Sequence, residues 1–162
     1  MKKIYIILVL LLTLSVTAFA QSGKSLYNKY SDRPGVEAVY ISPAMFRMIG
    51  KIPDVEFKDG EIDFTPIIKS MSGFYVLEAS DTKVAADLYA EVKKFIDKGD
   101  YELLIETKEN GEVTQIYSYG DEKTVSSLVM IQQEQGETMY VSIDGKMDRE
   151  ELENLLAQAA AE

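Results

Sequence analysis

One stretch of the chain has the residue types and spacing of a nucleophilic catalyst. Ser80-Asp81-Thr82-Lys83 matches the Ser-x-x-Lys pattern of penicillin-recognising enzymes, in which a lysine one helical turn along faces the serine and tunes its proton. Serine is also a common N-cap, so the same residues are equally typical of an ordinary helix start. The partner patterns Ser-Asp-Asn and Lys-Thr-Gly are absent, since Lys123-Thr124 is followed by Val125, and the chain is too short for that enzyme fold. We therefore assign no catalytic residue.

An acidic stretch offers a weak candidate for a calcium site. Asp59, Glu61 and Asp63 have the 1-3-5 spacing of a calcium-binding loop. An EF-hand loop then needs glycine at its sixth position and glutamate at its twelfth, where this chain has phenylalanine and serine. A looser site that includes Asp54 and Glu56 stays open, but a solvated acidic turn is the simpler interpretation. We expect no metal and no cofactor.

The remaining candidates for chemistry are weaker. Gly23-Lys24-Ser25 copies the end of a phosphate-binding loop, but the upstream glycine and a preceding strand are missing. Pairs such as Glu150-Glu151 and Asp97/Asp100 are typical of solvated helix surfaces. The chain has no histidine, cysteine or tryptophan, which excludes a Ser-His-Asp triad, a thiol nucleophile and a Cys/His zinc site. These absences argue against an enzyme without deciding the question.

The first twenty residues are typical of a cleaved secretory signal. Lys2 and Lys3 precede an apolar core from Ile4 to Leu14, and Ala18-Phe19-Ala20 is an A-x-A cleavage site. The apolar stretch is short for a spanning helix of about 20 residues. We predict a mature chain that starts at Gln21, is exported to the periplasm or the extracellular space, and has no stable membrane insertion after cleavage.

The mature chain is strongly acidic. The precursor has a net charge of −10, and the loss of Lys2 and Lys3 makes it −12. Such a surface repels phosphate backbones, so we expect no nucleic-acid partner. A secreted chain without cysteine has no disulfides, so its core must hold it together.

Hydrophobic periodicity predicts an ordered series of strands and helices. Ser42-Pro43 marks one helix start, Ser80 or Asp81 caps a helix that ends at Gly99, and Asp148 with Glu151 forms a capping box. Turn residues such as Asn110-Gly111 separate the later strands, and connections this short force antiparallel pairing. The predicted strands are residues 36–41, 73–79, 101–107, 112–119, 125–133 and 138–143.

The segment of residues 55–64 is a hairpin candidate. Asp59-Gly60 is a favoured two-residue turn, which would place Lys58 opposite Glu61. Alternatively, this segment is an acidic surface loop that leads to a helix at Thr65-Pro66.

These elements predict an α+β fold, in which helices pack on an antiparallel β-sheet made of a four-strand meander plus one or two earlier strands. We divide the chain into a cleaved signal peptide (1–20), an N-terminal tail or short irregular helix (21–35) and a single α+β domain (36–162). Leu88, Val92 and Leu103 are expected in one core between helix and sheet.

Three segments also carry a family resemblance: VEAVYISPAMFRMIG, YELLIETKENGEVTQIYSYG and VSSLVMI. With them the chain resembles domain-of-unknown-function family 4252, which comprises small secreted Bacteroidetes proteins, over about residues 36–156. The resemblance implies a cell-envelope location and an uncharacterised function, with a hint toward envelope sensing, since members are often encoded near extracytoplasmic sigma-factor systems. It implies no site residues, because the shared motifs are fold motifs.

The meander strands have apolar residues on both faces. A sheet covered on one side only alternates cleanly between apolar and polar residues, but here Leu128 and Met130 lie opposite Val129 and Ile131. The second face is either covered by the first segment of the chain, which we favour, or a binding surface with Tyr117 and Tyr119 as candidate contacts.

The sequence therefore favours a non-enzymatic binding or interaction module of the cell envelope, with an unidentified envelope protein or ligand as partner. The alternatives are a small hydrolase that uses carboxylate or Ser/Lys chemistry and a structural envelope subunit.

Overall fold

The structure is a computed structural model that describes residues 23–49, 51, 58–59, 62–63 and 65–159. Its helices are α2 (Gly23–Tyr30), α3 (Pro43–Ile49), α4 (Thr65–Ser70), α5 (Thr82–Lys98) and α6 (Arg149–Ala159). Its strands are β1 (Val36–Ile41), β2 (Lys58–Asp59), β3 (Ile62–Asp63), β4 (Met71–Ala79), β5 (Glu102–Glu109), β6 (Glu112–Gly120), β7 (Thr124–Glu134) and β8 (Glu137–Asp148).

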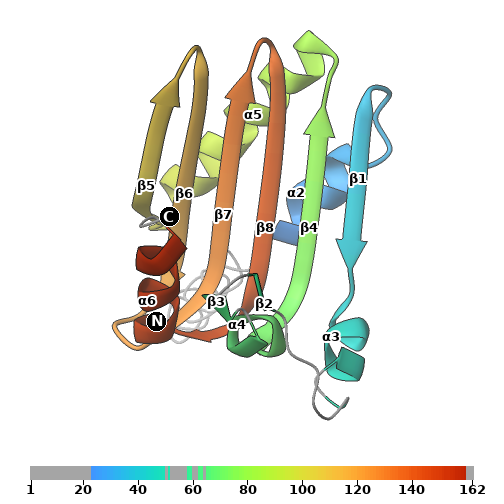
Figure 1. Cartoon of the computed structure of the whole chain (residues 1–162). Coiled ribbons are helices and arrows are strands. Elements are labelled where there is room, and N and C mark those ends of the chain that lie inside the picture. The colour runs from blue at the N-terminus through green and yellow to red at the C-terminus, as the bar shows by residue number, and fades with distance from the viewer. Residues whose placement is uncertain (1–22, 50, 52–57, 60–61, 64, 160–162) are drawn as a thin grey trace, which may run out of the picture.

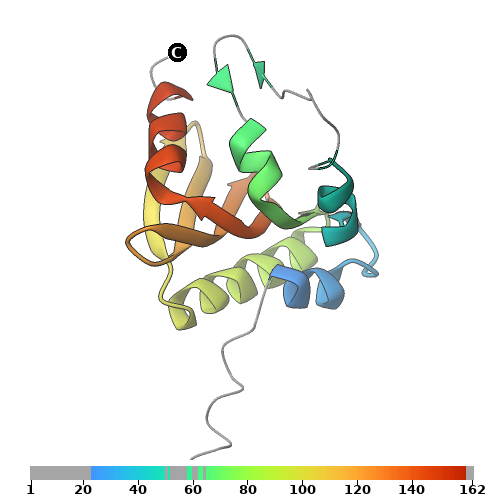
Figure 2. The ribbon, with the colours of Figure 1, turned by 90° about the horizontal axis from the view of Figure 1, so that it is seen from below.

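A six-stranded antiparallel sheet organises the molecule, in the order β1-β4-β8-β7-β6-β5. Strands β5 to β8 form the predicted meander, and β4 joins its last strand while β1 forms the far edge. The α+β fold predicted from the sequence is confirmed. Helices α5 and α2 lie behind the sheet in Figure 1, whereas α4 and α6 lie in front of its lower end. Figure 2 shows these two helix pairs on opposite sides of the sheet.

Local sequence signals explain where these elements begin and turn. The Asp81 carboxylate caps α5 by accepting hydrogen bonds from the backbone N–H groups of Lys83 and Val84, at 3.1 and 3.0 Å. Asn110 and Gly111, at the β5–β6 turn, both have positive φ angles of 50° and 91°. Two successive residues of positive φ make the type of hairpin turn that matches the twist of the strands. Gln135-Gly136 repeats this geometry between β7 and β8.

Two apolar cores hold the helices to the sheet. The larger lies under α5 and α2 and includes Leu88 and Val92, both fully buried. The smaller lies under α4 and α6 and includes Ile67, Val125 and Leu152. The described residues thus form a layer of sheet with unequal helix cover on its two faces.

Three local expectations differ from the structure. Residues 23–30 form helix α2, whose Leu26 and Tyr30 are buried in the larger core. Of the two alternatives for residues 21–35, the short helix is therefore correct for this part and the tail is not. The β2–β3 hairpin exists, but Lys58 pairs with Asp63 instead of Glu61, which lies outside the described residues.

Leu103 is the third difference, because its side chain is 48 % exposed and lies outside the predicted core. Helix α5 packs on β4, β7 and β8, whereas Leu103 lies on the edge strand β5. Alternation had identified its face of the sheet, where it pairs with Tyr117, but not how far across the sheet the helix extends.

No helix in the described part of the chain combines the length and apolar character needed to cross a membrane.

Candidate binding face

The Ser-x-x-Lys stretch forms a helix start in the structure. The Ser80 hydroxyl donates a hydrogen bond of 3.4 Å to the backbone carbonyl of Gly35, and Asp81 is the N-cap of α5. Lys83 contributes its backbone N–H to that cap. These four residues therefore form the N-terminal cap and first turn of α5, as the cap interpretation predicts.

The calcium candidates fall on the β2–β3 hairpin. Asp59 lies in β2 and Asp63 in β3, while Glu61, Asp54 and Glu56 lie outside the described residues. The Asp63 carboxylate accepts a hydrogen bond of 2.9 Å from the backbone N–H of Thr65, at the start of α4. Among the residues that the structure describes, no group of three or more acidic side chains could hold a metal ion.

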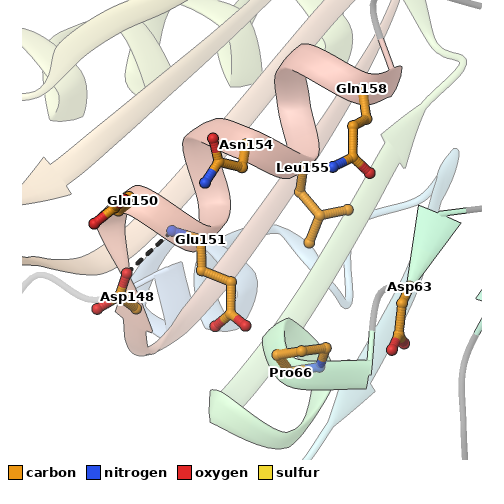
Figure 3. Close-up of a pocket in the computed structure, with 8 residues that line it drawn as sticks. All are labelled: Asp63, Pro66, Asp148, Glu150, Glu151, Asn154, Leu155 and Gln158. Carbon is orange, nitrogen blue, oxygen red and sulfur yellow. Dashed lines mark hydrogen bonds between the residues drawn. The ribbon is translucent and has the colours of Figure 1, made fainter.

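A hollow of about 690 Å³ lies between α6 and the start of α4, and Asp63, Asp148, Glu150 and Glu151 line part of it (Figure 3). Asp148 accepts a hydrogen bond of 3.0 Å from the backbone N–H of Glu151 and so caps α6. The hollow thus consists of helix caps and solvated carboxylates, and we assign it no function.

Tyr117 and Tyr119 differ in their surroundings. Tyr117 is only 6 % exposed, because it faces α5, and its hydroxyl accepts a hydrogen bond of 2.6 Å from the Lys93 ammonium. Tyr117 is therefore too buried to serve as the candidate contact that the binding-surface alternative requires. Tyr119 is 41 % exposed and its ring centroid lies 5.4 Å from that of Tyr101. A contact of Tyr119 with a partner stays a prediction.

A cluster of polar groups lies on the same side of the sheet as α5 and α2. The Tyr101 hydroxyl donates to Ser127 Oγ at 3.3 Å, and burial raises the pKa of the neighbouring Asp144 carboxyl above its ordinary value, against the opposing effect of the Ser127 hydroxyl. Tyr140 and Ser142 are fully buried, and within the described part of the chain neither hydroxyl makes a well-formed hydrogen bond. A single carboxyl with a raised pKa resembles half of a general acid–base pair.

The opposite face of the sheet points toward the viewer in Figure 1, and the strand register places a row of apolar residues on it. The strand register pairs Val39 with Val76, Val76 with Val141, Val141 with Met130, Met130 with Ile116, and Ile116 with Ile105. Directly paired residues of antiparallel strands point to the same face. We call this set the apolar row: Val39, Val76, Val141, Met130, Ile116 and Ile105.

Helix cover ends before it reaches the apolar row. Two residues along β7 and β8 toward α4 and α6, Leu128 belongs to the smaller core and Ile143 packs against it. The apolar row shares no residue with either core. Val39 is 50 % exposed, and the other five residues of the row are half-buried. No described helix lies in front of this part of the sheet in Figure 1. The expected cover by the first segment of the chain is present on the face that carries Tyr117 and Tyr140, where α2 packs in the larger core. It does not extend to the face of the apolar row.

Sequence reasoning detected apolar residues on two faces of the meander but not this arrangement. The alternation of side chains within each strand was enough to identify the apolar residues of this face. The row itself depends on the register of β1 and β4 against the meander, which turn residues do not specify because long segments connect these strands.

Comparison with known proteins gives a family and no described relative. A family model described as a domain of unknown function (DUF4252) matches residues 30–155. No curated protein matches the chain, and no solved structure matches it either. The match spans β1 through most of α6, so it includes every strand of the apolar row.

Proposed function

The chain belongs to the DUF4252 family, and from that premise we propose that it is an exported cell-envelope protein that binds a protein partner without catalysing a reaction. The single observation behind this proposal is the apolar row, which runs across all six strands on a face that the described helices leave open. Contiguous apolar surface of this kind is costly to leave in water and typically marks an interaction site.

The export part of the proposal rests on the sequence. The segment from Lys2 to Ala20 has the three regions of a secretory signal. A partner in the cell envelope follows from that destination.

Two variants of matched exposure test the binding face. Val39 and Leu103 lie on opposite edge strands and opposite faces, and their side chains are 50 % and 48 % exposed. Val39→Glu places a charge at the end of the apolar row, whereas Leu103→Glu places one on the side of α5. Tagged wild-type protein and both variants are used to capture proteins from envelope extracts, after their melting temperatures have been compared.

We expect Val39→Glu to lose a band that the wild type and Leu103→Glu both capture. Capture of the same proteins by Val39→Glu and wild type, or equal losses in the two variants, would contradict a binding role for this face. The comparison is valid because both sites are exposed, so neither substitution is expected to change stability by more than about 1 kcal/mol.

The alternative of a hydrolase has one supporting group, Asp144. Carboxylate catalysis of hydrolysis uses a pair of groups with divergent pKa values. Among the described residues, Asp144 is the carboxyl whose pKa is raised, and its neighbours are the hydroxyls of Ser127, Tyr101, Tyr75 and Tyr140. We therefore favour the binding role.

A further inference from the structure

The charges on the open face indicate what kind of partner it fits. Beyond the apolar row, toward the β5–β6 and β7–β8 turns at the top of Figure 1, the same face carries glutamates from every strand of the sheet. We call this set the glutamate border: Glu37, Glu78, Glu109, Glu112, Glu134 and Glu137.

The glutamate border is not neutralised within the described part of the chain. The ion pairs of the neighbouring helices and strands involve other acids, as in Lys29–Glu91 and Lys108–Glu106. No ion pair joins a described lysine or arginine to a border carboxylate. Glu112 is held in place by hydrogen bonds from Gln132 at 2.8 Å and Thr114 at 3.2 Å. On β1 and β4 the border glutamates come directly after the apolar row, whereas on β5 to β8 one row lies between the two sets: Thr107, Thr114, Gln132 and Met139. The face therefore offers an apolar band and, toward the turns, a band of negative charge.

The dimensions of the face fit a helix. Six strands at about 4.8 Å spacing make the apolar row about 24 Å long, which a helix of about 16 residues spans at 1.5 Å per residue. The other face of the sheet gives a precedent, since α5, with 17 residues, packs across β4, β8 and β7 using Leu88, Val92 and Phe95. The sheet thus already packs an amphipathic helix on its other face, and the open face has room for a helix of similar length.

Charge disfavours the other occupants. A second copy would bring its own glutamate border, or the acidic helix α6 with Glu150, Glu151 and Glu153, against the border of the first. Like charges in such contacts are repulsive. Anionic membranes and nucleic acids are repelled for the same reason.

We infer that the open face binds a basic amphipathic helix of a partner protein. Its aliphatic residues lie on the apolar row, and its lysine or arginine residues lie over the glutamate border. This inference rests on the proposed function and adds the chemistry of the partner to it.

A designed peptide tests the inference. The probe is a helix-forming peptide of about 18 residues with leucine on one face and lysine on the other, and a matched peptide has glutamate in place of lysine. Titration calorimetry measures their affinities for the full mature chain. We expect the lysine peptide to bind at least about tenfold more tightly than the glutamate peptide, and to weaken as salt is raised.

Two triple variants of equal charge change show whether the border itself is responsible. Glu37→Gln/Glu134→Gln/Glu137→Gln removes three exposed carboxylates of the border, whereas Asp97→Asn/Asp100→Asn/Glu122→Gln removes three exposed carboxylates elsewhere. We expect the first to weaken the lysine peptide about tenfold and the second less than about twofold. Val39→Glu should also weaken binding while Leu103→Glu should not.

Equal effects of the two triple variants would overturn the inference, since the peptide would then respond only to net charge. Equal binding of the two peptides would overturn it as well. Either result leaves the proposed function standing if Val39→Glu alone loses its captured protein. Sedimentation that shows a wild-type dimer and a Val39→Glu monomer would identify a second copy as the occupant and also overturn the inference.

Discussion

At the scale of single residues, Asp144 is a buried acid in a polar but uncharged setting. Burial raises the pKa of its carboxyl from 3.8, and the Ser127 hydroxyl offsets only part of this effect. The same carboxylate contributes to the raised pKa values of Tyr101 and Tyr75, the latter to about 12. Within the part of the chain that the structure describes, no lysine or arginine contributes to the shift in the pKa of Asp144, so no described cation compensates its negative charge.

We predict that Asp144→Asn is more stable than the wild type at neutral pH. Because the pKa is raised in the folded state, the folded protein binds the proton more tightly, and its stability falls as pH rises above 3.8. Asparagine removes that loss, so the difference in free energy of unfolding should be present at about pH 7 and vanish near about pH 3.5. Urea denaturation at both pH values measures it.

The control for this experiment is Asp97→Asn on the exposed side of α5, which should change stability by less than about 0.5 kcal/mol. A less stable Asp144→Asn at neutral pH would mean that the carboxylate holds the Ser127 and Tyr101 hydroxyls in place.

At the scale of elements, α5 and the strands on which it packs form most of the larger core. The helix begins at the Asp81 cap and buries Leu88, Val92 and Phe95 against β4, β7 and β8. Lys93, on the flank of this face, donates to the Tyr117 hydroxyl and lies 4.9 Å from the centre of its ring. The helix therefore combines an apolar contact with a specific polar one at its boundary.

We predict that Leu88→Ala costs about 2–5 kcal/mol of unfolding free energy, since it removes a fully buried side chain and leaves a cavity. Leu103→Ala should cost less than about 1 kcal/mol, because that leucine is half exposed at the edge strand. Chemical denaturation of the two variants compares them directly. A loss below about 0.5 kcal/mol for Leu88→Ala would contradict its place in the core.

At the scale of the whole molecule, the described helices cover the two faces of the sheet to different extents. One carries α5 and α2, whereas α4 and α6 cover only the lower end of the other (Figures 1 and 2). The larger core stabilises the fold from one side, which leaves the second face available for contact with another molecule. The acidic net charge of −10 makes copies of the chain repel one another.

We predict that the chain, expressed in a Gram-negative host, is found outside the cytoplasm with Gln21 at its N-terminus. The A-x-A site at Ala18-Phe19-Ala20 specifies that cleavage. Cell fractionation and intact mass spectrometry measure both properties, and a pyroglutamate from Gln21 agrees with the prediction. Recovery of membrane-bound protein that keeps Met1 to Ala20 would contradict it.

The sequence by itself determined the local elements and the class of fold. Strand alternation, the caps at Asp81 and Asp148, and turn pairs such as Asn110-Gly111 depend on neighbours a few residues apart, so they can be read along the chain. The meander followed from them, because short turns permit only antiparallel pairing of adjacent strands. The α+β class followed in turn.

Only the tertiary structure decided which side chains share a face and which face is covered. The positions of β1 and β4 in the sheet, and the side on which α2 packs, depend on contacts between residues far apart in the sequence. For that reason Tyr117, a candidate surface contact, is buried, whereas Leu103, an expected core residue, is exposed. The apolar row and the glutamate border exist only once six strands are in register, since each strand supplies one residue to each set.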